Sequence, residues 1–325
     1  MAARTVPFWS VRFLRAYVMT MRPYLLFISG AAGLVGLSFA PGLPPARVAL
    51  AFVPLFLSYG MGQALTDCFQ TDTDAISAPY RPLVSGVVAS RQVLLTSLAG
   101  LTAVVLVLAC LDPRILAAGV AAVIGLLTYT IFKRTWWGGP PWNAWIVALI
   151  PLMGRLVDRA WSPASLFRPR GPEDAAFLLS VLAVFTGYAN FVVVGYFKDI
   201  SADRATGYRT FPVVFGWRAA AVYGDITATL AAGLAVGALA LLRANALSLV
   251  VLAAAVALYL HAQVSVHRTR DERATGTPIA NGVRALVLLC LAVVTANEPR
   301  WAPWLAPFYM LFELTLWLRP ERGQV

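Results

Sequence analysis

The sequence predicts an all-α fold, a polytopic membrane bundle of helices around a central cavity. Hydrophobic residues make up 59% of the 325 residues and charged residues only 13%, a composition that excludes an ordinary soluble domain. The apolar residues form long runs, and a hydrocarbon core about 30 Å thick needs roughly 20 apolar residues in each spanning helix. Acidic residues are scarce, and several of them gather at the ends of two apolar runs.

Nine apolar runs are predicted to be transmembrane helices, because polar or helix-breaking residues separate each run from the next. A tenth run, 302–318, is broken by prolines and either spans the membrane or lies along its surface. The nine runs are 23–40, 47–69, 92–111, 114–132, 142–157, 175–197, 218–242, 246–264 and 279–296.

We expect one transmembrane domain over 22–318, a cytoplasmic N-terminal segment, 1–21, and a C-terminal tail, 319–325. The first run lacks a small-residue cleavage pattern, so the N-terminal segment is expected to be retained. Basic residues gather in this segment and in certain interruptions between runs, which the positive-inside rule places in the cytoplasm. This asymmetry accounts for the net charge of +11 without a nucleic-acid partner. The cytoplasmic interruptions are 67–91, 133–141, 198–217 and 265–278, and the interruption 158–174 is expected on the opposite face.

Two acidic stretches each follow a long apolar run: 66–74, with the sequence TDCFQTDTD, and 198–203, with the sequence KDISAD. Carboxylates at the mouth of a membrane helix are costly to desolvate, and a divalent cation between two such groups lowers that cost. Asp199 and Asp203 are four residues apart and therefore share one side of their helix end. We therefore expect a metal ion that bridges the two stretches and an anionic ligand.

A weak internal repeat suggests that the two stretches meet in space. Asp74 precedes a Tyr-Arg pair that ends at Arg81, and Asp203 precedes a Tyr-Arg pair that ends at Arg209. Duplicated bundles commonly place equivalent polar helix ends around one cavity. Mg²⁺ prefers oxygen ligands and is usually completed by phosphate oxygens of a substrate, which suits an incomplete cage of carboxylates.

These residues resemble the UbiA superfamily of intramembrane prenyltransferases, whose members carry an NDxxDxxxD motif after the second helix and a DxxxD motif after the sixth. Two positions depart from the first motif: Thr66 stands where Asn is usual, and Gln70 stands where the middle Asp is usual. An amide in place of a carboxylate removes a unit charge, so metal binding at that position is expected to be weaker. The resemblance spans nearly the whole chain and is carried by Arg22-Pro23, 74–86, 129–134 and 196–213.

The resemblance also implies a role for individual residues. The catalytic carboxylates are expected to be Asp67, Asp74, Asp199 and Asp203. With Gln70, these four are expected to hold two or more Mg²⁺ ions, which act as the Lewis acid. The residues expected to bind the diphosphate are Arg81, Lys133, Lys198 and Arg209. The residues expected in the substrate pocket are Thr66, Asn190 and Tyr196. For Asn190, a hydrogen bond to a neighbouring helix is an equally favoured interpretation. Arg22 and Arg134 are expected mainly to anchor the topology.

The predicted function is transfer of the prenyl group of a C10 to C20 prenyl diphosphate to a small, aromatic acceptor. An alternative keeps the fold and the ionisation step but lets a double bond of the prenyl chain capture the cation, which makes the protein a membrane terpene cyclase. A transporter is a remote alternative, because it does not explain why acids cluster at two matching helix ends near basic residues. We therefore expect an enzyme embedded in the lipid bilayer, with its N-terminus and active-site loops in the cytoplasm.

Overall fold

All ten apolar runs fold into helices in the computed structural model, which describes residues 5–8 and 10–319. These residues contain helices and no β-strand, so the predicted all-α class is confirmed. The α-helices are α1 (Val11–Met21), α2 (Leu26–Ser38), α3 (Pro45–Asp67), α4 (Thr71–Ser77), α5 (Ser90–Leu111), α6 (Ile115–Thr135), α7 (Gly139–Leu156), α8 (Pro172–Tyr196), α9 (Ile200–Ala205), α10 (Phe211–Leu241), α11 (Ala246–Arg268), α12 (Gly276–Asn297) and α13 (Ala302–Trp317). Short 3-10 helices are η1 (Pro23–Leu25), η2 (Pro163–Leu166), η3 (Phe197–Asp199), η4 (Glu272–Ala274) and η5 (Pro299–Trp301).

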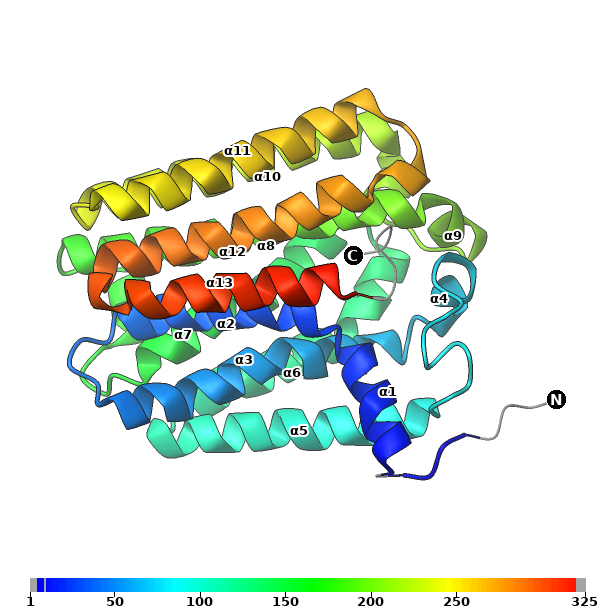
Figure 1. Ribbon diagram of the computed structural model, residues 1–325, viewed down its shortest axis with the longest axis horizontal. Coiled ribbons are helices and arrows are strands. Elements are labelled where there is room, and N and C mark those ends of the chain that lie inside the picture. The colour runs from blue at the N-terminus through cyan, green and yellow to red at the C-terminus, as the bar shows by residue number, and fades with distance from the viewer. Residues whose placement is uncertain (1–4, 9, 320–325) are drawn as a thin grey trace.

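The number of membrane spans differs from the expected nine or ten. Seven of the described helices are long and apolar enough to cross a membrane, or eight if α1 and η1–α2 form one bent span. The helix α2 has 13 residues and rises only about 20 Å, so it is too short to cross by itself. The helix α13, with 16 residues and an internal proline, is also too short, although it runs alongside α12 (Figure 1).

The surface of the bundle suits a multi-pass membrane protein. Large apolar side chains point outward from the long helices: Leu106 of α5 is 56% exposed, Ile124 of α6 is 55% exposed and Val250 of α11 is 66% exposed. Contiguous apolar surface of this kind is rare on soluble monomers and fits contact with lipid tails.

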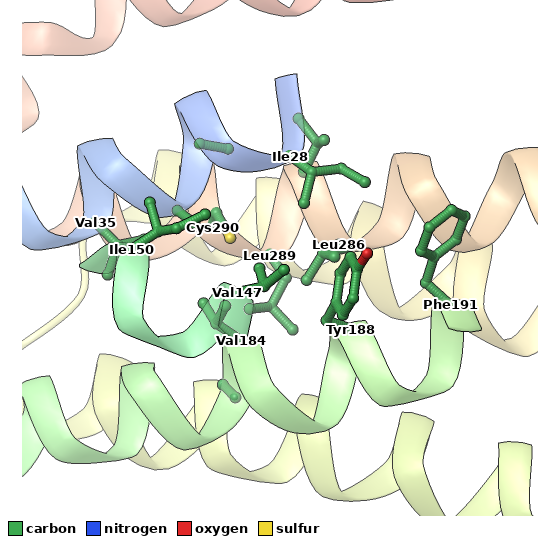
Figure 2. Packing of buried hydrophobic residues seen from close by; sticks show 14 of the residues in the cluster. Ile28, Val35, Val147, Ile150, Val184, Tyr188, Phe191, Leu286, Leu289 and Cys290 are labelled. Carbon is green, nitrogen blue, oxygen red and sulfur yellow. The ribbon is translucent and has the colours of Figure 1, made fainter. Parts of the chain in front are cut away.

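The core lies between α2, α7, α8 and α12, which pack closely side by side (Figure 1). Small residues allow this approach, because a side chain at Gly36 of α2 would overlap the carbonyl oxygen of Pro151 in α7. Figure 2 shows part of the core, to which Val35, Ile150, Val184 and Leu289 contribute one side chain from each of the four helices.

The two acidic stretches lie at the same end of the bundle, as the internal repeat predicts. The short helices α4 and α9, which carry part of each stretch, are neighbours there (Figure 1), and the hydroxyl groups of Thr73 and Thr206 are 2.9 Å apart. The loop 158–174 lies at the other end, where Arg159 Nε donates to the carbonyl oxygen of Leu111 over 2.8 Å.

The N-terminal segment is part of the packed bundle and is not a polar extension. The helix α1 packs against α3 and buries Phe13, Ala16 and Tyr17. The predicted C-terminal tail, 319–325, lies outside the described residues except for Arg319.

Candidate active site

A cavity opens at the acidic end of the bundle and extends between its helices. Its mouth carries the carboxylates of Asp67, Asp74 and Asp199 together with basic residues. Its walls come from α3, α5, α6, α7 and α8 and are mainly apolar, with Val104, Leu126, Ile146, Ile150, Phe191 and Val192 among the lining residues. The cavity therefore has a charged mouth and an apolar interior. An apolar group bound in that interior would be shielded from water.

Asp67 is held at the mouth by two neighbours. The Nη2 atom of Arg22 lies 3.0 Å and 2.8 Å from its two carboxylate oxygens, and Gln63 Nε2 donates to the first of these oxygens over 2.7 Å. Asp67 is 3% exposed, so the charge on Arg22 compensates a carboxylate that water does not reach.

The backbone of Arg22 is strained. It has φ 53° and ψ 78°, a left-handed conformation that costs a residue with a β-carbon roughly 1–2 kcal/mol. The strain arises where α1 ends and Pro23 begins η1, at a bend of 49° between the two segments. Backbone strain of this kind collects at functional sites, and here the residue that carries it binds Asp67.

Arg81 pairs with a carboxylate of the first stretch and lines the cavity beside the second. Its guanidinium forms an ion pair with Asp74. Although burial works against its charged form, Asp74, Asp67 and Asp199 together raise the pKa of Arg81. Arg81 lines the cavity together with Asp67, Asp74 and Asp199, so acids of both motifs surround one space.

A second buried cation, Lys133, lies between Gln70 and Asp203. Its ammonium nitrogen donates to Gln70 Oε1 over 3.0 Å and lies 3.5 Å from Asp203 Oδ1. The other carboxylate oxygen of Asp203 accepts a hydrogen bond from Thr210 Oγ1 over 3.1 Å. The ammonium also lies 5.3 Å and 5.1 Å from the ring centroids of Tyr196 and Tyr208, within the range of cation–π attraction.

Most of the expected site residues line the cavity, and three do not. Asp203 is completely buried behind Lys133, and it is absent from the cavity lining. Arg209 has an exposed side chain outside the lining. Asn190 is buried between helices, where its Nδ2 donates to the carbonyl oxygen of Gly224 over 2.7 Å. The expected residues that do line the cavity are Thr66, Asp67, Gln70, Asp74, Arg81, Lys133, Tyr196, Lys198 and Asp199.

Sequence reasoning did not assign several lining residues to the site. The sequence predicts Arg22 mainly as a topology anchor, although its place beside a proline before the first long run is a usable signal. Tyr59 and Tyr188 share a hydrogen bond of 2.8 Å between their hydroxyl groups within the cavity wall, and Tyr129 bonds Tyr196 in the same way over 2.9 Å. No sequence pattern marks Tyr59 or Tyr188, because their pairing depends on how α3 and α8 pack, whereas Tyr129 and Tyr196 begin two of the segments that carry the family resemblance.

Within residues 5–8 and 10–319, no three His, Cys, Asp or Glu side chains lie close enough together to hold a metal ion by themselves. Asp67 and Asp74 each form an ion pair with a guanidinium group. Both carboxylates face the cavity, so an ion that enters with an anionic ligand would meet oxygen donors from the protein.

Comparison with known protein families identifies the family to which the chain belongs. Residues 26–281 match the family model described as the UbiA prenyltransferase family. The chain belongs to this family. The match covers most of the chain, from α2 to the first turns of α12, and includes both acidic stretches.

Relatives in the UbiA prenyltransferase family support this assignment. The chain is 34% identical over 212 residues to a digeranylgeranylglyceryl phosphate synthase of Natronomonas pharaonis, a match that covers 63% of this chain and 70% of the relative. It is 27% identical over 248 residues to an enzyme of the same name from Thermococcus kodakarensis, covering 72% of this chain and 84% of the relative. The predicted enzyme class, a prenyltransferase, is confirmed, and these comparisons give no support to a terpene cyclase or a transporter.

Solved structures of UbiA homologues have the same fold. One from Aeropyrum pernix superposes with a TM-score of 0.68 at 20% identity, covering 80% of this chain and 94% of that chain. One from Archaeoglobus fulgidus, bound to GPP and Mg²⁺, superposes with a TM-score of 0.63 at 18% identity, covering 86% of this chain and 99% of that chain.

Proposed function

We propose that this chain is a Mg²⁺-dependent intramembrane prenyltransferase that ionises a C10 to C20 prenyl diphosphate and transfers the prenyl group to a small acceptor. The observation that carries the proposal is the cavity itself, which joins carboxylates and cations of both motifs at its mouth to apolar walls. A prenyl diphosphate has the same division into a charged head and an apolar tail.

The oxygen donors at the mouth suit Mg²⁺. We propose that Asp67, Asp74 and Asp199 supply carboxylate oxygens to the ion and that phosphate oxygens of the substrate complete its ligands, because hard cations prefer oxygen ligands. When bound, Mg²⁺ supplies Lewis-acid stabilisation of the departing diphosphate.

Basic residues at the mouth are placed to bind the diphosphate. We propose that Arg81, Lys133 and Lys198 stabilise its oxygens, because fixed cations in a water-poor site need no reorganisation as charge develops. The bond between the prenyl C1 atom and the diphosphate oxygen breaks, and its electron pair leaves with the diphosphate. The acceptor then forms a bond to C1 and loses a proton.

The walls protect the allylic cation that ionisation leaves behind. Tyr59, Tyr188 and Phe191 present aromatic rings to the cavity, and ring faces attract cations. The apolar side chains between them keep water away from the cation, which favours transfer over hydrolysis.

Two acceptor classes enter the proposal. The sequence predicts an aromatic small molecule, whereas the names of the relatives specify a prenylated glyceryl phosphate as product. Both classes share the donor half of the reaction, so the same carboxylates and cations serve either. We further propose that the acidic end of the bundle faces the cytoplasm, as the distribution of basic residues predicts.

The test combines chelation with a single substitution. Purified protein is incubated with C10, C15 and C20 diphosphates and Mg²⁺, with either an aromatic acceptor pool or a prenylated glyceryl phosphate, and products are identified by mass spectrometry. EDTA, or Asp199→Ala in protein that remains folded by gel filtration, is expected to abolish product formation. Full activity in EDTA would contradict the proposed metal dependence, and a hydrocarbon formed without acceptor would contradict transfer.

A further inference from the structure

We infer that Asp72, Arg134 and Tyr208 form a clamp outside the cavity that holds the two acidic motifs together for binding of the metal ion and the diphosphate. All three side chains lie outside the cavity lining, so they are positioning residues. The inference rests on the proposed function, and it gives Arg134 a role beyond the topology anchor that the sequence predicts.

The clamp is a closed ring of hydrogen bonds between three parts of the chain. Arg134, in the last turn of α6, donates from Nη2 to Asp72 Oδ2 over 2.7 Å and to the Tyr208 hydroxyl over 3.0 Å. The Tyr208 hydroxyl in turn donates to Asp72 Oδ1 over 3.2 Å. The clamp therefore joins α4, the end of α6 and the segment between α9 and α10. Hydrogen bonds to charged groups are stronger than neutral ones, and bonds linked in a network polarise one another.

Both ends of the clamp are attached to expected metal ligands. Asp72 lies in the first turn of α4, between Gln70 and Asp74 of the first motif. Tyr208 is bound to the second motif, because its backbone N–H donates to the carbonyl oxygen of Asp203 over 2.8 Å. A bond between Asp72 and Tyr208 thus limits the movement of the first motif relative to the second.

The ring of Tyr208 connects the clamp to the cavity. Tyr208 is 1% exposed, and its ring centroid lies 4.5 Å from the guanidinium carbon of Arg134 and 5.1 Å from Lys133 Nζ. Both distances are within the range of cation–π attraction. Lys133 itself lines the cavity. The clamp therefore also helps to fix a cation that is proposed to bind the diphosphate.

The clamp differs from the inner contact that Lys133 makes with both motifs. Lys133 lines the cavity, where a bound diphosphate would compete for its ammonium, whereas the clamp lies outside and keeps its bonds. A hydrogen bond between Thr73 and Thr206 also joins α4 to α9, so loss of the clamp should loosen the motifs without separating them. The side chains of Arg134 and Asp72 are 44% and 40% exposed, and exposed ion pairs contribute little to folding stability.

Hydrogen exchange in full-length protein in lipid nanodiscs tests the clamp without turnover. Arg134→Gln changes a residue of neither motif, and we expect it to raise exchange over both 71–77 and 200–205, by roughly threefold to tenfold for the loss of one charged hydrogen bond. Asp72→Asn, a change on α4, should raise exchange in α9 as well. The melting temperature should stay within about 2 °C of the wild type, because the ion pair is exposed.

A matched control comes from another ion pair of the same distance and exposure. His267 Nε2 lies 2.7 Å from Asp225 Oδ2, and the two side chains are 42% and 40% exposed. This pair joins α11 to α10 and belongs to neither motif. We expect Asp225→Asn to leave exchange over 71–77 and 200–205 unchanged.

Ligand binding gives a second measurement, in which positioning and simple charge effects have opposite signs. The wild type and the variants are titrated with geranyl thiolodiphosphate, an unreactive diphosphate, in the presence of Mn²⁺. Removing the negative charge of Asp72 would by itself favour an anion, whereas loss of the clamp weakens its binding. We expect Asp72→Asn and Arg134→Gln each to raise the Kd by about tenfold, because misplaced binding groups lose affinity. The double variant should resemble the single variants, because each of them breaks the same clamp.

The outcomes separate the inference from the function on which it rests. Tighter or unchanged binding of the diphosphate by Asp72→Asn would overturn the inference and leave the proposed function intact. Exchange that rises only in α4 in that variant, or losses that add in the double variant, would also overturn it. Failure of the wild-type chain to bind the diphosphate with Mn²⁺ would contradict the proposed function itself.

Discussion

Arg22 is the residue whose removal tests the construction of the cavity mouth most directly. Its Nη2 atom lies within 3.0 Å of both oxygens of Asp67, and the two side chains are only 16% and 4% exposed. Arg22→Gln removes the charge and leaves the Asp67 carboxylate buried, with Gln63 as its remaining hydrogen-bond donor among the contacts described above. We expect this variant to be destabilised, because the buried Asp67 carboxylate loses its direct ion-pair partner, and breaking a buried pair costs more than the pair itself contributes.

The size of the expected loss of stability follows from the burial of the ion pair and from the left-handed backbone of Arg22. Breaking a buried pair by removing one partner costs about 3–5 kcal/mol. Arg22→Gly loses the same charge but relieves the left-handed strain, so it should be about 1 kcal/mol more stable than Arg22→Gln. The double variant Arg22→Gln, Asp67→Asn removes both charges and should recover most of the loss, which a double-mutant cycle measures as coupling.

Thermal unfolding in detergent provides the assay, with the wild type, Arg22→Gln, Arg22→Gly, Asp67→Asn and the double variant measured at one lipid and salt composition. At roughly 2 °C per kcal/mol for a chain of this size, Arg22→Gln should melt at least about 6 °C below the wild type. If the losses of Arg22→Gln and Asp67→Asn simply add in the double variant, the two residues do not act as a pair and this reasoning is wrong. Equal melting of the Gln and Gly variants would contradict the strain at position 22.

Three further predictions concern other parts of the fold. Glu272 accepts hydrogen bonds from the backbone N–H and the hydroxyl of Ser201, within the second acidic motif; Glu272→Gln should weaken them by about 1 kcal/mol and raise hydrogen exchange over 199–203. Asn190→Ala should lower the free energy of unfolding by about 1 kcal/mol through its lost helix-to-helix bond while KM for the diphosphate stays unchanged, and a raised KM would return Asn190 to the substrate pocket. With the native cysteines removed, a cysteine at exposed Phe167 should be labelled in intact cells and one at Ser85 only after permeabilisation, a pattern whose reversal would invert the proposed orientation.

Helix identity and the position of the acidic stretches could be predicted from the sequence, because both depend on local properties. Run length and hydropathy determine which segments are helical, and the acids follow directly from the ends of their runs. The number of spans could not be predicted in the same way. Residues 23–25 of the first run form η1 and α2 ends at Ser38, so only 13 residues of that run are α-helical, and α7, with 18 residues, is also not among the seven.

The pairing of charges within the site could not be predicted either. Lys133 was expected to face a diphosphate, and it does line the cavity, but its contacts to Gln70 and Asp203 depend on how α6 packs against both motifs. Those three residues are distant in sequence, and spacing along one helix says nothing about neighbours on another. The unusual amide at position 70 is therefore interpretable only once its partner is known.

The internal repeat was informative about the motifs and misleading about the basic residues that follow them. It makes Arg81 and Arg209 equivalent, yet Arg81 lines the cavity and Arg209 is exposed. The cause is the connection after each motif. The chain from Asp74 to the start of α5 at Ser90 is twice as long as the chain from Asp203 to the start of α10 at Phe211, so only the first has the length to fold back over the mouth.

In the second half, Gly207 turns the chain with φ 77°, and the Arg209 N–H donates to the carbonyl oxygen of Arg134 at the surface. The cation set at the mouth is consequently asymmetric, and the place of a second-half arginine is taken by Lys133 from α6 and by Lys198, which precedes the second motif.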